Sequence, residues 1–286
     1  MKEIFKQFYA FISKLLKTII SFLSVLFFSS FSSNKKIKKL RDHVLVYDEC
    51  IVMGNGPSLN PVLIYNLCTL KHRNIFAVNF FCNTEYFNRL KPSFYLLQDP
   101  LLFANNIEDL SENMNLLVKN FNEISWPMVV LIPYGFDFKN SKLFKEIDNN
   151  NLLFFQFNVT PISGFKFAEN WLFKHNLGMP ASQTVINSAI FLAINLNYKI
   201  IHLYGVEQSW LKYLSVGNDN KISVGLSHFY SGSDKTGENR TLSEFLLSQA
   251  TVFKSHLRLD EYSKHLGSYI LNHTPGSYID AYDRVV

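Results

Sequence analysis

The stretch ECIVMGNGPSLN, residues 49–60, decides the fold. Its apolar run IVM (51–53) breaks at once into GNGPS (54–58). Glycine reaches φ > 0 and proline fixes its own φ, so a plain turn is one interpretation. A ligand site is the other, because a strand that ends in a glycine turn and feeds a helix points several N–H groups at one spot, which suits a phosphate. The stretch is not a full GxGxxG or P-loop match, so it leaves both interpretations open.

The charge of the chain is uneven along its length. The 286 residues carry a net charge of +5, but residues 1–41 hold nine basic residues and one acidic residue, a sum of +8. The remaining 245 residues therefore sum to −3. The basic pI belongs to the N-terminal segment and gives no support to nucleic-acid binding by the main domain. A content of 48% hydrophobic residues, with 27 Phe, predicts a globular core and argues against disorder.

The three cysteines, Cys50, Cys68 and Cys82, are odd in number and form no C-x-x-C pair. We interpret them as reduced thiols, consistent with a reducing compartment.

The N-terminal segment, residues 1–42, is predicted to associate with a membrane. TIISFLSVLFFSSF (18–31) carries no charge, but it is only 14 residues long and holds four serines, whereas a spanning helix needs about 20 apolar residues. Upstream, apolar residues recur at helical spacing between lysines, and KKIKK (35–39) follows. This pattern favours a helix lying in an anionic membrane surface, although it leaves open whether 18–31 span the membrane.

This segment has two alternative interpretations. A cleaved signal peptide is disfavoured, because the apolar part begins late and strong positive charge follows it. An amphipathic helix packed on its own domain is the other alternative.

Residues 43–286 show the pattern of a single α/β domain. Short apolar runs that end in polar turns alternate with helical stretches, which predicts a Rossmann-like, mostly parallel sheet with helices on both faces. In such sheets ligands bind at the carboxyl ends of the strands. Residues 208–240 are rich in Ser, Gly, Asn and His and are predicted to form a long polar loop that acts as a lid. The expected strands are 50–53, 75–78, 94–97, 128–132, 153–155, 200–204 and 269–271, and the expected helices are 105–121, 184–196 and 242–266.

Polar residues follow several of the expected strands. For any one of them a helix cap or turn is the commoner explanation, but four strands in succession favour a ligand site. Amides and carboxylates at one sheet edge suit a nucleotide's base, ribose and phosphates. The residues are Asn55 and Ser58, then Asn79, then Gln98 and Asp99, then Gly205 and Glu207.

No Asp-x-Asp occurs in the chain, so a metal-dependent diphosphate-sugar mechanism lacks its usual ligands. No Cys/His cluster suggests zinc either. We therefore expect neither a metal nor a cofactor.

Five pieces of the chain carry a resemblance to a known family: GNGPSL (54–59), FAVNFF (76–81), FYLLQDPLLF (94–103), LNYKIIHLYGVE (196–207) and SHFY (227–230). In this order they resemble the bacterial sialyltransferases of glycosyltransferase family 42. YGVEQSW (204–210), HFY (228–230) and NHTPGSYIDAYDR (272–284) are similar to a broader group, the MptE-like glycosyltransferase proteins of surface-polysaccharide gene clusters. The resemblance covers residues 48–286.

The resemblance implies a single Rossmann-like domain with a lid, a CMP-activated sugar donor, no metal, and inversion at the anomeric carbon. The donor sugar would be sialic acid, a related nonulosonate or Kdo. The acceptor would be a surface glycan or glycolipid at the cytoplasmic face of the bacterial inner membrane, where the basic N-terminal helix would hold the enzyme.

The resemblance also assigns roles to single residues. Asn55 and Ser58, with the N–H groups of the turn Gly54–Gly56, would meet the donor phosphate, and Asn79 the ribose or the sugar. Asp99 stands where the sialyltransferases have Asn, and Gly205 and Glu207 would complete the nucleotide site. Ser277 and Asp280 of NHTPGSYID could close the nucleotide pocket; the alternative is a plain turn at Pro275-Gly276 before a short helix capped by Ser277. The sialyltransferases have a lid tyrosine pair that assists the leaving phosphate; here the nearest residues are Trp210, Tyr213 and Tyr230.

His228 is the predicted catalytic base, with Tyr230 as a second catalytic residue. An inverting transfer needs a base for the acceptor hydroxyl, and histidine titrates near working pH. His228 falls in the polar stretch beside Ser227, whereas other histidines fall within expected strands or helices.

Two further functions remain open. Phosphoryl transfer to a pterin, as in an MptE-like diphosphokinase, would need acidic residues for Mg²⁺, and Asp99 and Glu207 are candidates. A membrane-tethered nucleotide-binding or assembly protein without enzymatic activity is the other.

Overall fold

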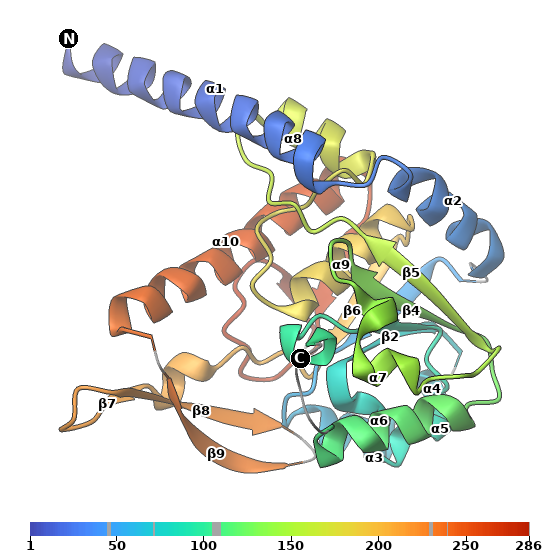
Figure 1. The fold of residues 1–286 in the computed structure, drawn as a ribbon. Helices are drawn as coiled ribbons and strands as arrows, with labels where there is room; N and C mark the ends of the chain where they lie inside the picture. The colour runs from blue at the N-terminus through green and yellow to red at the C-terminus, as the bar shows by residue number, and fades with distance from the viewer. Residues whose placement is uncertain (45–46, 71, 105–109, 229–230, 239, 286) are drawn as a thin grey trace.

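The computed structural model describes the whole chain except residues 45–46, 71, 105–109, 229–230, 239 and 286 (Figure 1). Its centre is an eight-stranded sheet in the order β11-β10-β6-β1-β2-β3-β4-β5, and every neighbouring pair is parallel. The predicted α/β class with a parallel sheet is confirmed. The strands are β1 (Glu49–Met53), β2 (Asn74–Val78), β3 (Phe94–Leu96), β4 (Met128–Pro133), β5 (Leu152–Phe157), β6 (Ile200–Tyr204), β10 (Tyr269–Asn272) and β11 (Asp283–Arg284).

The sheet reverses its direction of growth between β1 and β6. The chain builds β1 to β5 outward on one side, then returns to place β6 on the other side of β1. Such a switch point opens a crevice at the carboxyl ends of the two strands, where α/β proteins bind ligands.

Both faces of the sheet are covered, which explains why its central strands β1 to β4 are nearly continuous apolar runs. Cys50 and Val52 belong to one buried cluster, whereas Ile51 and Met53 belong to another, because successive side chains point to opposite faces. The first cluster lies under α2 (Ser33–Val44), α8 (Lys166–Lys174), α9 (Val185–Asn195) and α10 (Leu242–His265). The second lies under α3 (Leu59–Tyr65), α4 (Leu67–Leu70), α5 (Tyr86–Leu90), α6 (Glu112–Glu123) and α7 (Lys142–Lys145), and Figure 1 shows the two groups on opposite sides of the sheet.

The helix expected over 105–121 begins later than predicted. Ser111 accepts a hydrogen bond from the N–H of Met114 and caps α6, which runs to Glu123. Residues 105–109 lie outside the described part. The cap fixes the start because it satisfies an N–H group that the first turn leaves without an intrahelical partner.

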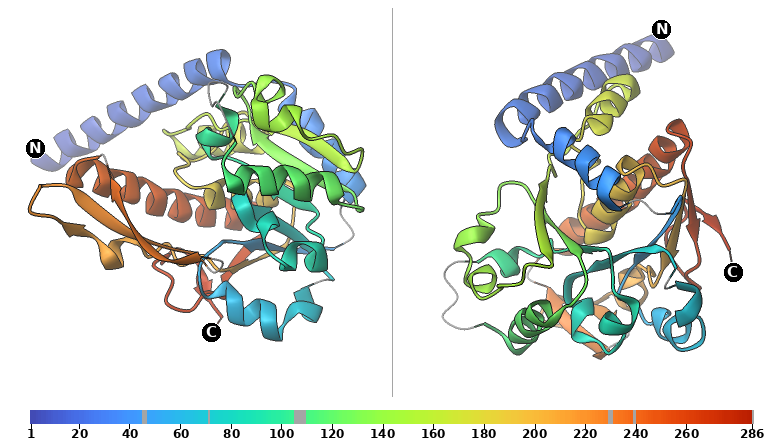
Figure 2. Two further views of the ribbon diagram at one scale, coloured as in Figure 1. Left: turned by 60° about the horizontal axis from the view of Figure 1, so that its bottom comes forward. Right: turned by 90° about the vertical axis from the view of Figure 1, so that its right-hand side faces the viewer.

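The predicted polar loop over 208–240 is wrong in form. It begins with the short helix η4 (Trp210–Tyr213) and then builds an antiparallel sheet of β7 (Ser215–Val216), β8 (Ile222–His228) and β9 (Ser231–Glu238). The sheet has its own small core, in which Ile222 and Val224 pack with Phe245 of α10. Figure 2 shows it beside one end of α10. Ile222 and Val224 alternate along β8 and point to the same face, as in a half-buried strand. The polar residues around them made this strand pattern hard to recognise in the sequence.

The N-terminal segment forms one long helix, α1 (Lys2–Phe28), followed by α2, so the predicted helix is confirmed. Among the described helices, α1 is the one long and apolar enough to cross a membrane, by length and composition alone. Its N-terminal end projects from the body (Figure 1). The expected boundary at residue 42 falls inside α2, and Val25, Ile37 and Leu40 are buried in the core of the main domain.

The second half of α1 is fixed to the segment before α8 by hydrogen bonds. The hydroxyl of Ser21 donates to the carbonyl of Ser163 (2.8 Å), and the N–H of Phe165 donates to Oγ1 of Thr18 (2.9 Å). A Cβ on Gly164 would lie 2.1 Å from that same Thr18 oxygen, so only glycine lets the helix come this close.

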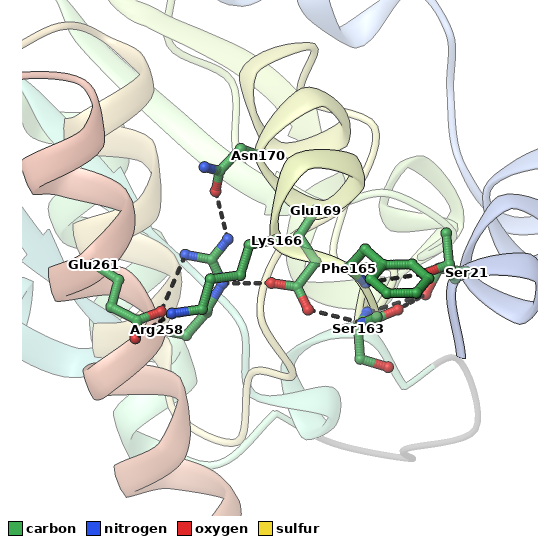
Figure 3. A network of polar contacts seen from close by, with 10 residues as sticks. Ser21, Ser163, Phe165, Lys166, Glu169, Asn170, Arg258 and Glu261 are labelled. Atoms are coloured by element: carbon green, nitrogen blue, oxygen red, sulfur yellow. Dashed lines mark hydrogen bonds and ion pairs between the residues drawn. The ribbon is translucent and has the colours of Figure 1, made fainter. Parts of the chain in front are cut away.

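An ionic network continues from this contact to α10 (Figure 3). Glu169 accepts from the N–H of Gly164 (2.7 Å) and from Nε of Arg258 (2.5 Å). Arg258 also donates to Asn170 and lies 3.6 Å from Glu261. Both side chains of the central pair are largely shielded from solvent, with 11% of Glu169 and 15% of Arg258 exposed.

Replacing Glu169 by Ala is predicted to lower the free energy of unfolding by about 3 kcal/mol, because it leaves a shielded guanidinium with too few partners. Urea denaturation measures the loss. Lys166→Ala is the matched control: its ion pair with Glu261 is 70% and 47% exposed, so its removal should cost less than about 1 kcal/mol. Equal losses in the two variants would contradict a structural role for the shielded pair.

Candidate ligand site at the switch point

Two turns meet at the switch point. The N–H of Gly54, just after β1, donates to the carbonyl of Tyr204 (2.8 Å), and that of Gly56 donates to the carbonyl of Gly205 (2.9 Å). A Cβ on Gly54 would lie 2.2 Å from the Gly205 oxygen. Gly205 itself has φ +66°, where a side chain is disfavoured. Glycine at positions 54 and 205 therefore allows the turn after β1 and the turn after β6 to approach each other closely.

Glu207 bridges the two turns through its side chain. Its Oε1 accepts a hydrogen bond of 2.6 Å from the N–H of Ser58, at the start of α3. Its Oε2 is buried and has no partner among the described residues. The N–H of Ser58, which we expected to bind a phosphate, thus donates to the Glu207 carboxylate instead. A phosphate could accept from this N–H only by displacing Glu207.

The backbone around Glu207 is held by the C-terminal segment. The N–H of Tyr278 donates to the carbonyl of Glu207 (2.8 Å), and the hydroxyl of Ser277 donates to that of Val206 (2.7 Å). Thr274 accepts from the N–H of Val206 (3.1 Å). Ser277 is buried and does not line the cavity described below. It therefore supports the backbone beside Glu207 and does not contact the cavity itself.

The ends of β2 and β3 add polar side chains to the same edge. Asn55 donates to the carbonyl of Val78 (3.2 Å), which turns its Oδ1 away from that contact. Asn79 has φ +48°, a left-handed conformation that Asn tolerates better than most residues. Gln98 lies 3.3 Å from Ser182, and Asp99 caps the short helix η2 (Pro100–Phe103) by accepting from the N–H of Leu101 (3.0 Å).

These residues surround a cavity of about 490 Å³. The predicted residues Gly54, Asn55, Gly56, Asn79, Asp99, Gly205 and Glu207 all line it, and Ser58 adjoins it through Glu207. Lys, Arg and His are absent from the described lining, whereas the carboxylates of Asp99 and Glu207 belong to it. The full lining comprises residues 54–57, 78–79, 98–100, 182–186, 205–210, 213 and 225.

Four oxygens of these lining residues are buried without a partner among the described residues: Oδ1 of Asn55 and of Asn79, Oε1 of Gln98, and Oε2 of Glu207. A buried acceptor without a donor costs free energy. Such a group fits a ligand that brings several hydroxyl or amino groups.

The opposite wall of the cavity was missed by sequence reasoning. Thr184 caps α9, and Ser182 donates to the Thr184 carbonyl (2.9 Å). Gln208 has φ +47° and lies 3.4 Å from the Thr184 hydroxyl. The only local signal for this wall is a cap residue before the apolar run of α9.

A buried histidine holds Gln208. His256 of α10 contacts Oε1 of Gln208 through Nε2 (3.0 Å) and the Tyr282 hydroxyl through Nδ1 (2.8 Å). Burial lowers the pKa of His256 to about 3. The ring therefore stays neutral at physiological pH and acts as a structural hydrogen-bond partner.

Of the two predicted catalytic residues, the structure describes the position of His228 alone. His228 is the last residue of β8, not part of a loop as predicted, and Gly225 of the same strand lines the cavity. Tyr230 lies outside the described residues. Trp210 and Tyr213, the predicted counterparts of the lid tyrosines, both line the cavity.

Comparison with known proteins gives few matches. No protein-family model matches the chain, and no curated protein matches it either. Among solved structures, that of the MAf glycosyltransferase from Magnetospirillum magneticum AMB-1 overlaps with 83% of this chain at a TM-score of 0.47 and 12% identity. The overlap covers 33% of that protein, so this chain spans about a third of its length. The likeness is too slight to carry an argument about activity, and the resemblance to family 42 stays a prediction.

Gly56→Ala is predicted to dismantle the site. A Cβ there would lie 1.5 Å from Oε2 of Glu207 and 2.8 Å from the Gly205 carbonyl, so the carboxylate must leave Ser58. We expect a loss of about 2 kcal/mol in unfolding free energy, measured by urea denaturation. Gly217→Ala is the control, because its Cβ would come too close only to the exposed Asp219 side chain and would make an ordinary contact of 3.7 Å with the Lys221 carbonyl oxygen. Unchanged stability in Gly56→Ala would show that the Glu207–Ser58 contact is not formed.

Proposed function

We propose that the protein is a membrane-associated glycosyltransferase that binds a CMP-activated sugar in the cavity at the switch point and transfers the sugar with inversion, without a metal. The observation that carries the proposal is the set of four unpartnered buried acceptor oxygens at one cavity. A ribose and a sugar supply hydroxyl donors for such oxygens, and the cytosine amino group supplies another.

The charge of the lining supports a donor with a single phosphate. Two carboxylates and no described basic side chain repel a diphosphate more strongly than a monophosphate. The leaving CMP keeps its charge on the phosphate and needs hydrogen-bond donors more than an acid. Tyr213 and Trp210 line the cavity, and we assign to them the O–H and N–H donors for this phosphate.

The acceptor hydroxyl needs a base, and we assign that role to His228. In the proposed step its imidazole takes the hydroxyl proton while the acceptor oxygen bonds to the anomeric carbon and the bond from that carbon to the phosphate oxygen breaks. The donor sugar is sialic acid, a related nonulosonate or Kdo, and the acceptor is a surface glycan at the cytoplasmic face of the inner membrane.

A metal-dependent phosphoryl transfer is the second candidate, because Asp99 and Glu207 line one cavity with amide oxygens that suit Mg²⁺. Each carboxylate already accepts a backbone hydrogen bond through one oxygen. The described residues contain no group of three His, Cys, Asp or Glu side chains placed to hold a metal. The non-enzymatic alternative predicts ligand binding without turnover.

Nucleotide preference tests the donor. CMP should raise the melting temperature most and CDP less, because CDP carries a second phosphate, whereas UDP and ATP should not raise it. EDTA should leave the shift with CMP unchanged. Asn55→Ala or Asn79→Ala should reduce the CMP shift. Stabilisation by ATP that requires Mg²⁺ would move the assignment to phosphoryl transfer.

His228→Ala is predicted to lower kcat about 10²–10⁴-fold while CMP affinity stays within about twofold, because a base acts on the acceptor and not on the nucleotide. Release of CMP from the CMP-sugar, with and without acceptor glycan, measures the effect. His265→Ala, at the exposed end of α10, is the control. Near-normal turnover in His228→Ala would remove this histidine from the mechanism and leave Tyr230 or Glu207 as candidates.

A further inference from the structure

A second hollow lies along the same carboxyl edge of the sheet, at the ends of β4 and β5. It has a volume of about 470 Å³. Tyr134 follows β4, Val159 and Pro161 follow β5, and Phe27 and Phe28 come from the end of α1. We call this hollow the apolar groove. Hydrocarbon and aromatic side chains make up most of its wall. The cavity at the switch point, called the polar cavity below, differs in carrying the carboxylates of Asp99 and Glu207 and several amide groups.

The wall that α1 contributes is fixed in place. Thr160 donates to the carbonyl of Phe28 (3.2 Å), and Asn158 exchanges two hydrogen bonds with the backbone of Ser30 (2.8 and 2.9 Å). The hydroxyl of Ser29 donates to the carbonyl of Leu177 (2.6 Å). The groove is therefore formed by the folded protein, with the polar groups at its base already paired.

The groove continues into a wide exposed apolar surface. Phe27 and Phe28 are 78% and 69% exposed, and Leu23 and Leu26 extend the surface along α1. Trp171 of α8, whose ring lies 6.4 Å from that of Phe22, extends it sideways. An exposed apolar surface of this extent marks a contact with a membrane or a partner. The +8 charge of residues 1–41 favours an anionic bilayer.

The contacts of α1 place it along the bilayer surface. Thr18, Ser21 and Ser29 face the domain with hydrogen bonds. The ionic network of Glu169 and Arg258 lies directly behind that contact (Figure 3). A spanning α1 would pull these charges and backbone groups into hydrocarbon at a cost of several kcal/mol per group. With α1 lying in the surface, only its apolar side meets lipid.

We propose that the apolar groove binds the hydrocarbon chain of a lipid-linked acceptor glycan. This inference rests on the proposed glycosyl transfer. The polar cavity is centred near β1 and β2, and the groove lies at β4 and β5. Neighbouring strands are about 4.8 Å apart, so roughly 15 Å separate the two sites. The lipid headgroup and the first sugars occupy that interval when the chain lies in the groove.

A neutral photoreactive probe tests the groove: a dodecyl glycoside with a diazirine at the end of its chain, used below its micelle concentration on the full-length protein. We expect saturable labelling of residues 134–135 and 159–161, mapped by mass spectrometry. Phe28→Gln should weaken it about tenfold or more, because a phenyl contact with the chain is lost. Phe8→Gln, at a 62% exposed position of the projecting half of α1, should leave this labelling unchanged.

Labelling spread along α1 without saturation, or equally reduced in both variants, would overturn the groove as a binding site. Sedimentation with anionic vesicles separates the membrane contact from the groove, since both variants should lose a similar share of vesicle binding. The probe needs no nucleotide. A missing CMP shift with intact groove labelling would therefore count against the proposed function and not against the groove.

Discussion

The contact between the turn after β1 and the turn after β6 is the constraint on which the candidate site depends. Two strands from opposite halves of the sheet can converge there because Gly54 and Gly205 present no side chains to each other. Their approach lets Glu207 reach the N–H of Ser58, 149 positions earlier in the chain. The glycines of GNGPS are therefore required for backbone packing, and the candidate site is a consequence of that packing.

Much of the fold was predictable because the sheet is buried on both faces. A strand covered on both sides must be apolar throughout, so runs such as 51–53 and 128–132 stand out from the sequence. The lid sheet was not predictable in the same way. Its strands are mostly polar in sequence, and the buried contact of Ile222 and Val224 with Phe245 joins positions that are distant in sequence.

The residues of the candidate site also fall into two groups, those that could be predicted from the sequence and those that could not. Residues that follow strands could be found from the sequence, since parallel strands bring their carboxyl ends to one edge. The wall formed by Ser182, Thr184 and Gln208 could not, because its position depends on α10 and the buried His256. The serines of residues 18–31 interrupt the apolar pattern, and their partners too are distant in sequence. Ser21 of α1 and Ser29, the residue that follows α1, both form hydrogen bonds with the domain.

The hydrogen bonds between the α1 region and residues 158–165 have a consequence for acceptor selection under the proposed function. A helix joined to its domain by a free linker would let the domain tilt and rise, and the cavity could follow a glycan as it lengthens. Here helix and domain form one body, so on a bilayer the mouth of the cavity stays at a single height above the headgroups. The distance between an acceptor sugar and its lipid would then determine whether that sugar reaches the cavity and can be extended.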